Sequence, residues 1–332
     1  MPTPSAIAVQ LPTARGPLTE GLVRALRLEP ASPILLPDVD GGTDPFGEDL
    51  QAALYICYEL HYRGFDDVAD AWEWNPDLLG FRAELEKVFL TYLRERVEPG
   101  SDAVAEMKKV EVESTRDEGP SHHLSSHGTW TQMQEYFVHR SIYHLKEADP
   151  HAWAIPRLTG QAKASFVAVE FDEYGGGHRA RMHQQLFADL LDAAGLDSTY
   201  LGYLDQVPAA TLATVNVMSL FGLHRGLRGA AVGHFAATEI SSSPGSARLV
   251  TALRSMGAPE PCVHFYAEHV EADAVHEQVV RHDVVGSLIA ELPALEPDVV
   301  FGMRVADYVE ARLGDQLLGA WTGGESSLLR PL

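Results

Sequence analysis

The amino-acid sequence predicts an all-α protein, a helical bundle with an N-terminal helical extension. Apolar residues recur at three- and four-residue spacings in nearly every long segment, which is the period of an amphipathic helix. Few segments show the alternation of apolar and polar residues that a half-buried strand requires. The chain has 332 residues, of which 45% are hydrophobic, so it is long enough to bury a large core.

Residues 1–45 are expected to form a mostly irregular arm. Eight prolines in this segment remove backbone donors and leave room for at most one short helix, "LTEGLVRALRL". The arm therefore precedes the first strongly periodic segment.

Residues 46–132 are expected to be an N-terminal helical extension that ends in a loop. The stretches "DLQAALYICYELHYRGF" and "LLGFRAELEKVFLTYLRERV" have helical spacing, and Gly64 and Pro76 separate them. Residues 112–132 are polar, contain Ser, Gly and His and show no periodicity, so they are interpreted as a connecting loop. We interpret its histidines as solvated: His122, His123 and His127.

Residues 133–322 are expected to form the main bundle, and residues 323–332 a C-terminal tail. Helical spacing runs through these segments: 133–148, 163–174, 179–195, 208–240, 245–257, 265–292 and 298–321. Within 208–240 four glycines recur every three or four residues: Gly222, Gly226, Gly229 and Gly233. Each would weaken an isolated helix by about 1 kcal/mol relative to alanine, so we predict that another element packs closely there. A substrate channel beside this helix is the alternative.

Charge and motifs exclude several classes of function. The formal net charge of −22 repels a phosphate backbone and no basic patch offsets it, so nucleic acid is not an expected partner. No apolar run approaches the roughly 18 residues of a membrane span, and no secretory signal is recognised. Two cysteines, Cys57 and Cys262, are too few for a disulfide framework, so we expect a cytoplasmic protein. Phosphate-binding loops, a serine-hydrolase elbow and a dinucleotide fingerprint are absent from the sequence.

The segment "EHVEADAVHE", residues 268–277, has the spacing of a metal-binding helix face. At about 100° per residue, His269, Asp273 and His276 fall within about 60° of one another. Imidazole and carboxylate ligands together suit iron, manganese or zinc. The remaining acidic residues point away from this face or lie on its edge: Glu268, Glu271 and Glu277. The alternative is a hydrogen-bonded His and Asp set on a helix surface.

A metal in a bundle core needs ligands from other helices, and three residues in or beside apolar runs are candidates. These are Glu173, His183 and Glu239, each of which would need a cation or a partner if buried. A spacing of ten places Glu173 and His183 about 80° apart on an ideal helix, so they share a face only if the helix is distorted. The glycines at 175–177 make a distortion cheap. Glu170 is the alternative ligand on the same segment.

Taken together, "DEYGGG", "HQQLF", a glutamate on the next long helix and the His-x3-Asp-x2-His set resemble the haem-oxygenase-like di-iron oxidases and oxygenases, also described as iron-containing redox enzymes. The similarity is clearest over residues 135–320, and "ELHYRGF" with "WEWNPDLL" resembles the N-terminal helices of the same group. The resemblance implies a haem-oxygenase-like bundle and this ligand set: Glu147, Glu173, His183, Glu239, His269, Asp273 and His276.

The resemblance also implies the cofactor and the reaction class. Two Fe(II) ions, with O2 as co-substrate, would oxidise a small organic molecule, and the four carboxylates would balance the metal charge in a poorly solvated core. Outcomes within the family include amine N-oxygenation, oxidative C–C cleavage and desaturation, with an amino acid or amine as one substrate class. An unidentified electron donor and a homodimer are further expectations. Two alternatives stay open: a metal-free bundle that uses His and Glu as acid and base, and a metal-binding bundle without enzymatic activity.

Overall fold

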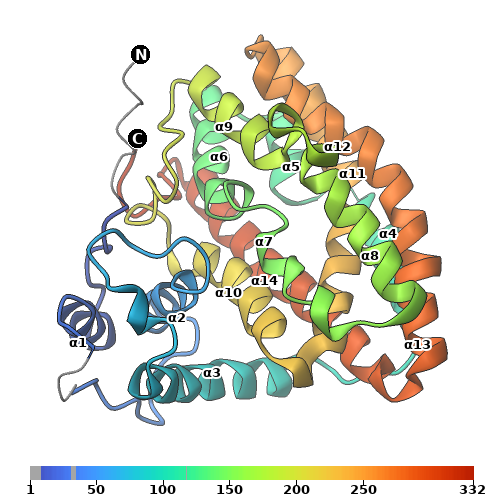
Figure 1. Ribbon diagram of the computed structural model, residues 1–332. Coiled ribbons are helices and arrows are strands. Elements are labelled where there is room, and N and C mark those ends of the chain that lie inside the picture. Colours follow the sequence, from blue (N-terminus) through green and yellow to red (C-terminus); the bar gives the residue numbers. More distant parts are fainter. Residues whose placement is uncertain (1–8, 31–34, 117) are drawn as a thin grey trace.

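The computed structural model describes residues 9–30, 35–116 and 118–332, without the side chains of Asp273 and Ala274. These residues form helices that are joined by turns and loops. No strand occurs within these residues (Figure 1). The all-α class predicted from the apolar spacing is therefore confirmed. None of the helices in the described ranges is long and apolar enough to cross a membrane.

The N-terminal extension contains α1 (Pro17–Leu26), α2 (Glu48–Glu59) and α3 (Pro76–Arg96), which lie together at one end of the molecule (Figure 1). Asp49 of α2 accepts the backbone N–H groups of Leu18 and Thr19, so it supplies partners that the first turn of α1 cannot find within the helix. In its described part the proline-rich arm is irregular apart from α1, which is buried through Leu22 and Leu26.

The predicted loop at residues 112–132 is wrong in part. This segment contains the end of α4 (Ala103–Ser114) and a short helix, α5 (Gly119–Ser126), which packs against α11 and α14. Leu124 is buried, and the His123 ring stacks on Trp321 with centroids 5.5 Å apart. One buried leucine in eight residues gives too little periodicity to be recognised in the sequence.

The main bundle has its longest helices at its centre, where α11 packs against both α12 and α14. Its helices are α6 (Trp130–His144), α7 (Asp149–Ala152), α8 (Gly160–Glu173), α9 (His183–Ala193), α10 (Ala209–Leu223), α11 (Arg228–Met256), α12 (Glu260–Val279), α13 (Ser287–Glu291) and α14 (Glu296–Gly323). Single turns of 3-10 helix cover 70–72, 155–157, 175–177, 179–181, 225–227 and 293–295, and a π-helical segment covers 280–286. The extension joins the bundle through α2, which packs on α10, and through α4 and α5, which pack on α11 and α14.

The predicted helical segments 208–240 and 245–257 have different limits in the structure. The segment 208–240 is broken after Leu223, whose carbonyl accepts from the Arg157 guanidinium at 2.8 Å. Beyond the break, α11 continues through Pro244 to Met256 instead of ending near residue 240. A proline inside a helix costs about 3 kcal/mol, which buried residues on both sides of Pro244, such as Ile240 and Leu249, offset.

Close packing beside the glycine series is confirmed at three of its four members. A Cβ on Gly233 would lie 1.9 Å from the Val299 carbonyl oxygen, and one on Gly302 would lie 2.1 Å from the Ala230 oxygen, so α11 and α14 cross in direct backbone contact. Gly222 and Gly229 are also closely approached, whereas nothing lies within 4 Å of Gly226. The prediction is therefore wrong for Gly226.

Candidate metal centre

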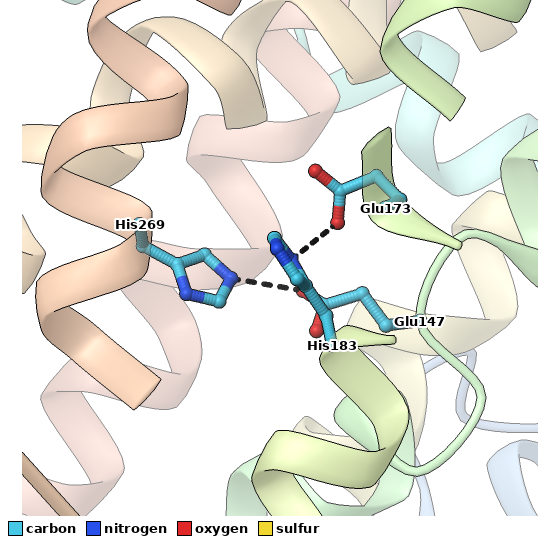
Figure 2. A group of neighbouring side chains, drawn as sticks. All are labelled: Glu147, Glu173, His183 and His269. Carbon is cyan, nitrogen blue, oxygen red and sulfur yellow. Dashed lines mark ion pairs between the residues drawn. The ribbon is translucent and has the colours of Figure 1, made fainter. Parts of the chain in front are cut away.

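Six buried side chains form two overlapping groups that can each hold a metal ion. Within each group, one potential ligand atom per residue lies within 4.8 Å of the others. The four-residue group consists of Glu147, Glu173, His183 and His269, and Figure 2 shows these side chains converging from separate segments. The three-residue group consists of Glu173, Glu239 and His276. All six belong to the ligand set expected from the sequence.

Glu173 is the last residue of α8 and His183 is the first residue of α9, with a tight glycine turn between them. The backbone φ angles of Gly175, Gly176 and Gly177 are 68°, 60° and 81°, values that residues other than glycine rarely adopt. The helix is therefore fully broken here, and Glu173 Oε2 lies 2.6 Å from His183 Nδ1 (Figure 2). Burial lowers the pKa of His183, but the Glu173 carboxylate outweighs burial and leaves the pKa raised.

Glu147 lies in the turn that follows α6. Its Oε1 atom is 2.8 Å from His144 Nδ1 and 3.6 Å from His269 Nε2, while no hydrogen-bond partner lies beside Oε2. Burial raises the pKa of Glu147, yet His144 and His269 together hold it below its usual range. His144 was missed by the sequence reading. The only sign in the sequence that His144 contacts Glu147 is its position three residues earlier, near the end of a predicted helix.

The two α12 histidines lie on the inward face of the helix, as the sequence spacing predicts. His269 Nδ1 donates to the Phe265 carbonyl at 2.7 Å, because a carbonyl can only accept, and this leaves Nε2 as the nitrogen on the Glu147 side. His276 Nδ1 lies 3.2 Å from Glu239 Oε2. Asp273 belongs to α12, but its side chain lies outside the described residues. The acidic residues at 268 and 271 are exposed, and the one at 277 is partly exposed.

Glu173 joins the two groups through different oxygen atoms. Oε2 lies beside His183, whereas Oε1 lies 3.6 Å from His276 Nδ1. Glu173 is thus the one residue that the two groups share, and each of its oxygen atoms faces a histidine of a different group.

Glu170, the alternative ligand, belongs to neither group but lines the same cavity of about 60 Å³ as Glu147, Glu173 and Glu239. Its carboxyl group is buried, and neither oxygen has a hydrogen-bond partner. Burial, with the nearby Glu173 charge, raises the pKa of Glu170 well above its usual value. A cation beside Glu170 would act against both causes of this shift.

A larger cavity of about 550 Å³ adjoins the metal groups. The two cavities share five lining residues: Tyr143, His144, Thr238, Ser242 and His269. Hydroxyl groups of Ser, Thr and Tyr line much of the larger one, and Arg140 forms a two-pronged ion pair with Glu310 on its wall, at 2.8 and 2.7 Å. Its volume is within the range of small-molecule sites.

Two comparisons with known proteins bear on this centre. The family model described as "Iron-containing redox enzyme" matches residues 134–311, which include every residue of both groups. The chain is also 26% identical over 161 residues to nitrosourea synthase of Streptomyces achromogenes subsp. streptozoticus. That alignment covers 48% of this chain and 34% of the relative, so the chain spans about a third of the relative's length.

Proposed function

Because the chain belongs to the family of iron-containing redox enzymes, we propose that it is a non-haem di-iron oxidoreductase that uses O2 to oxidise a small organic metabolite. The observation that carries the proposal is the pair of buried ligand groups that share Glu173. One metal would explain either group alone, whereas two overlapping groups suit two adjacent ions.

The donor set fits iron. Carboxylate and imidazole groups are the ligands of non-haem iron, and no thiolate takes part in either group. The glutamates are buried, and Glu147 Oε2 has no partner, so the cavity holds negative charge and acceptor capacity that cations would satisfy. Two divalent ions would balance Glu147, Glu173, Glu239 and Asp273.

We assign the residues as follows. Glu147, His183 and His269 would hold one ion, Glu239 and His276 with Asp273 would hold the other, and Glu173 would contact both. The iron ions supply the activation of O2, which the side chains themselves cannot perform. The hydrogen bond from His269 Nδ1 to Phe265 fixes the orientation of the imidazole before metal binds.

The protein around the ligands would exclude water and orient the substrate. Phe187 and Phe265 lie against the His144 ring, with centroids 4.8 and 5.0 Å apart, and Phe235 lines the small cavity on the other side. An apolar shell protects a reactive oxidant from water. Thr238 and Ser242 lie where the two cavities adjoin, so their hydroxyl groups are placed to hydrogen-bond the reacting end of a substrate.

The lining of the larger cavity combines polar and apolar surface. The Arg140–Glu310 pair and the hydroxyl groups beside apolar side chains suit a small metabolite that carries polar groups, such as an amino acid or an amine. The name of the relative, nitrosourea synthase, supports a nitrogen-bearing substrate and hence N-oxygenation here. Oxidative C–C cleavage and desaturation are the alternative outcomes. An external electron donor and a homodimer belong to the same proposal.

Anaerobic reconstitution with Fe(II) tests the proposal. We expect about two iron ions per chain and O2 consumption that depends on an amino acid or amine from a substrate panel. Less than about one iron per chain, unchanged in His269→Ala or His276→Ala, would favour the metal-free acid–base enzyme. Iron binding without substrate-dependent O2 uptake across the panel would favour a metal-binding bundle without enzymatic activity.

A further inference from the structure

We infer that the N-terminal extension is part of the metal centre: Glu59 of α2, through a buried ion pair with Lys146, is a positioning residue for Glu147. The inference rests on the proposed function, because it concerns how tightly the four-residue group binds its ion. Glu59 lies outside residues 134–311, the segment that the family model matches.

The ion pair is fully buried and fully partnered. Lys146 Nζ lies 2.8 Å from Glu59 Oε2, and the side chains are 1% and 0% exposed. The ammonium group also lies over the rings of Tyr55 and Tyr62, at 4.4 and 4.5 Å from their centroids. Tyr200 donates to the second oxygen of Glu59 at 2.7 Å. Lys146 therefore has one well-defined position against α2.

Lys146 and Glu147 are neighbours whose side chains serve opposite sides of one turn. The Lys146 side chain pairs with Glu59 of α2, whereas the Glu147 side chain contacts His144, which lines the metal cavity. The next residue, Ala148, has a φ of 72°, a conformation that residues other than glycine rarely adopt. Such a turn persists only where surrounding contacts hold it. Anchoring Lys146 thus fixes the direction in which Glu147 points.

A second set of contacts holds the same turn from both sides. Arg63, just after α2, donates to the Leu145 carbonyl at 3.2 Å and to Gln184 Oε1 at 2.9 Å. Gln184 in turn donates to the Glu147 carbonyl at 2.8 Å. The carbonyl groups on either side of Lys146 are therefore both bound, and the α2 end of the extension is connected through α9 to His183, the residue before Gln184.

The test is a metal titration of Glu59→Gln, which keeps the shape of the side chain but leaves the Lys146 ammonium opposite a neutral amide. Anaerobic Co(II) titration, followed by the visible bands of the bound ion, measures each equivalent. We expect one of two equivalents to bind about 10-fold more weakly, at the lower end of the effect of losing a direct hydrogen-bond partner of a ligand, because Glu59 acts on Glu147 only through Lys146. The other equivalent, held by Glu239 and His276, should change much less.

Two further variants separate positioning from general stability. Glu86→Gln makes the same change in α3, where Glu86 pairs with Arg82 at 3.1 Å. Glu86 is not one of the residues that hold the Glu147 turn. This substitution should lower the unfolding temperature and leave both metal affinities unchanged. Arg63→Gln removes a half-exposed side chain, so it should fold even if Glu59→Gln does not, and it should weaken the same equivalent. Glu59→Asp, which keeps the charge, should restore part of the affinity.

Three results would overturn the inference. The first is wild-type affinity for both ions in Glu59→Gln or, if that variant does not fold, in Arg63→Gln. The second is an equal loss of affinity for both ions in the same variant. The third is a loss of affinity for one ion in Glu86→Gln that matches the loss in Glu59→Gln. A wild-type protein that binds no Co(II) or Fe(II) would instead refute the proposed function, and the positioning role with it.

Discussion

Glu173 offers the sharpest test of the proposed two-ion centre, because its two oxygen atoms lie beside residues of different groups. We expect Glu173→Gln to lose both ions, since the amide has no charge and only one acceptor oxygen. Glu147→Gln and Glu239→Gln each change a residue that belongs to one group only, so each should lose one ion. The three substitutions remove the same charge in the same cavity, which makes them matched controls for one another.

The size of the effect follows from binding linkage. At a free metal concentration about 100 times the dissociation constant, each ion stabilises the folded state by about 2.7 kcal/mol. Two ions therefore contribute about 5 kcal/mol, which for a protein of this size corresponds to a rise in unfolding temperature on the order of 10 °C. Glu173→Gln should lose all of this rise, and each single-group variant should keep about half of it.

Iron counting by mass spectrometry and unfolding with and without Fe(II) under anaerobic conditions measure the two quantities together. Loss of only one ion in Glu173→Gln would refute the bridging arrangement. Loss of both ions in Glu147→Gln or in Glu239→Gln would show that the two groups do not bind their ions independently. That result would refute the assignment of one ion to each group.

Three further predictions concern stability and substrate binding. Burial lowers the pKa of His139 to about 3, against about 6.5 in an unfolded chain. The unfolded chain therefore takes up a proton first, and between these values His139 should contribute a loss of stability of about 1.4 kcal/mol for each unit that the pH falls. Unfolding of the metal-free protein as a function of pH measures this slope, and His139→Gln should reduce it; an unchanged slope would contradict the reasoning. Gly233→Ala places a methyl group 1.9 Å from the Val299 oxygen and should destabilise the protein by about 3 kcal/mol or more, whereas Gly226→Ala, with nothing within 4 Å, should have little effect in the same denaturant titration. Glu310→Gln breaks the ion pair with Arg140 on the cavity wall; it should raise KM for the substrate without changing the iron content, and loss of iron in this variant would contradict the separation of the two cavities' roles.

The helices were predictable from the sequence because their apolar spacing is a local property. The same holds for the inward face of α12, since His269 and His276 are seven residues apart, close to two full turns. Glu173 and His183 were predictable as partners only with a distortion, which the three glycines provide by ending one helix and starting another.

Contacts between distant segments could not be read from the sequence. Lys146 stands near the end of a predicted helix, and it is buried against Glu59, a partner 87 residues earlier in the chain. At the break before α11 the Leu223 carbonyl is bound by Arg157, and α5 packs with its His123 ring on Trp321. In each case the deciding partner lies in another element, and local periodicity carries no information about it.

The order of the ligands along the chain has a consequence for biosynthesis. Glu147, Glu173, Glu239 and His276 are contributed one after another as the chain grows, and α12, which carries the last of them, is made after the segments that carry the others. In the proposed two-ion centre, neither ion would have its full set of ligands on a chain that lacks α12. Iron would therefore be bound only after α12 has folded against α11, and the other ligands would be without metal until then.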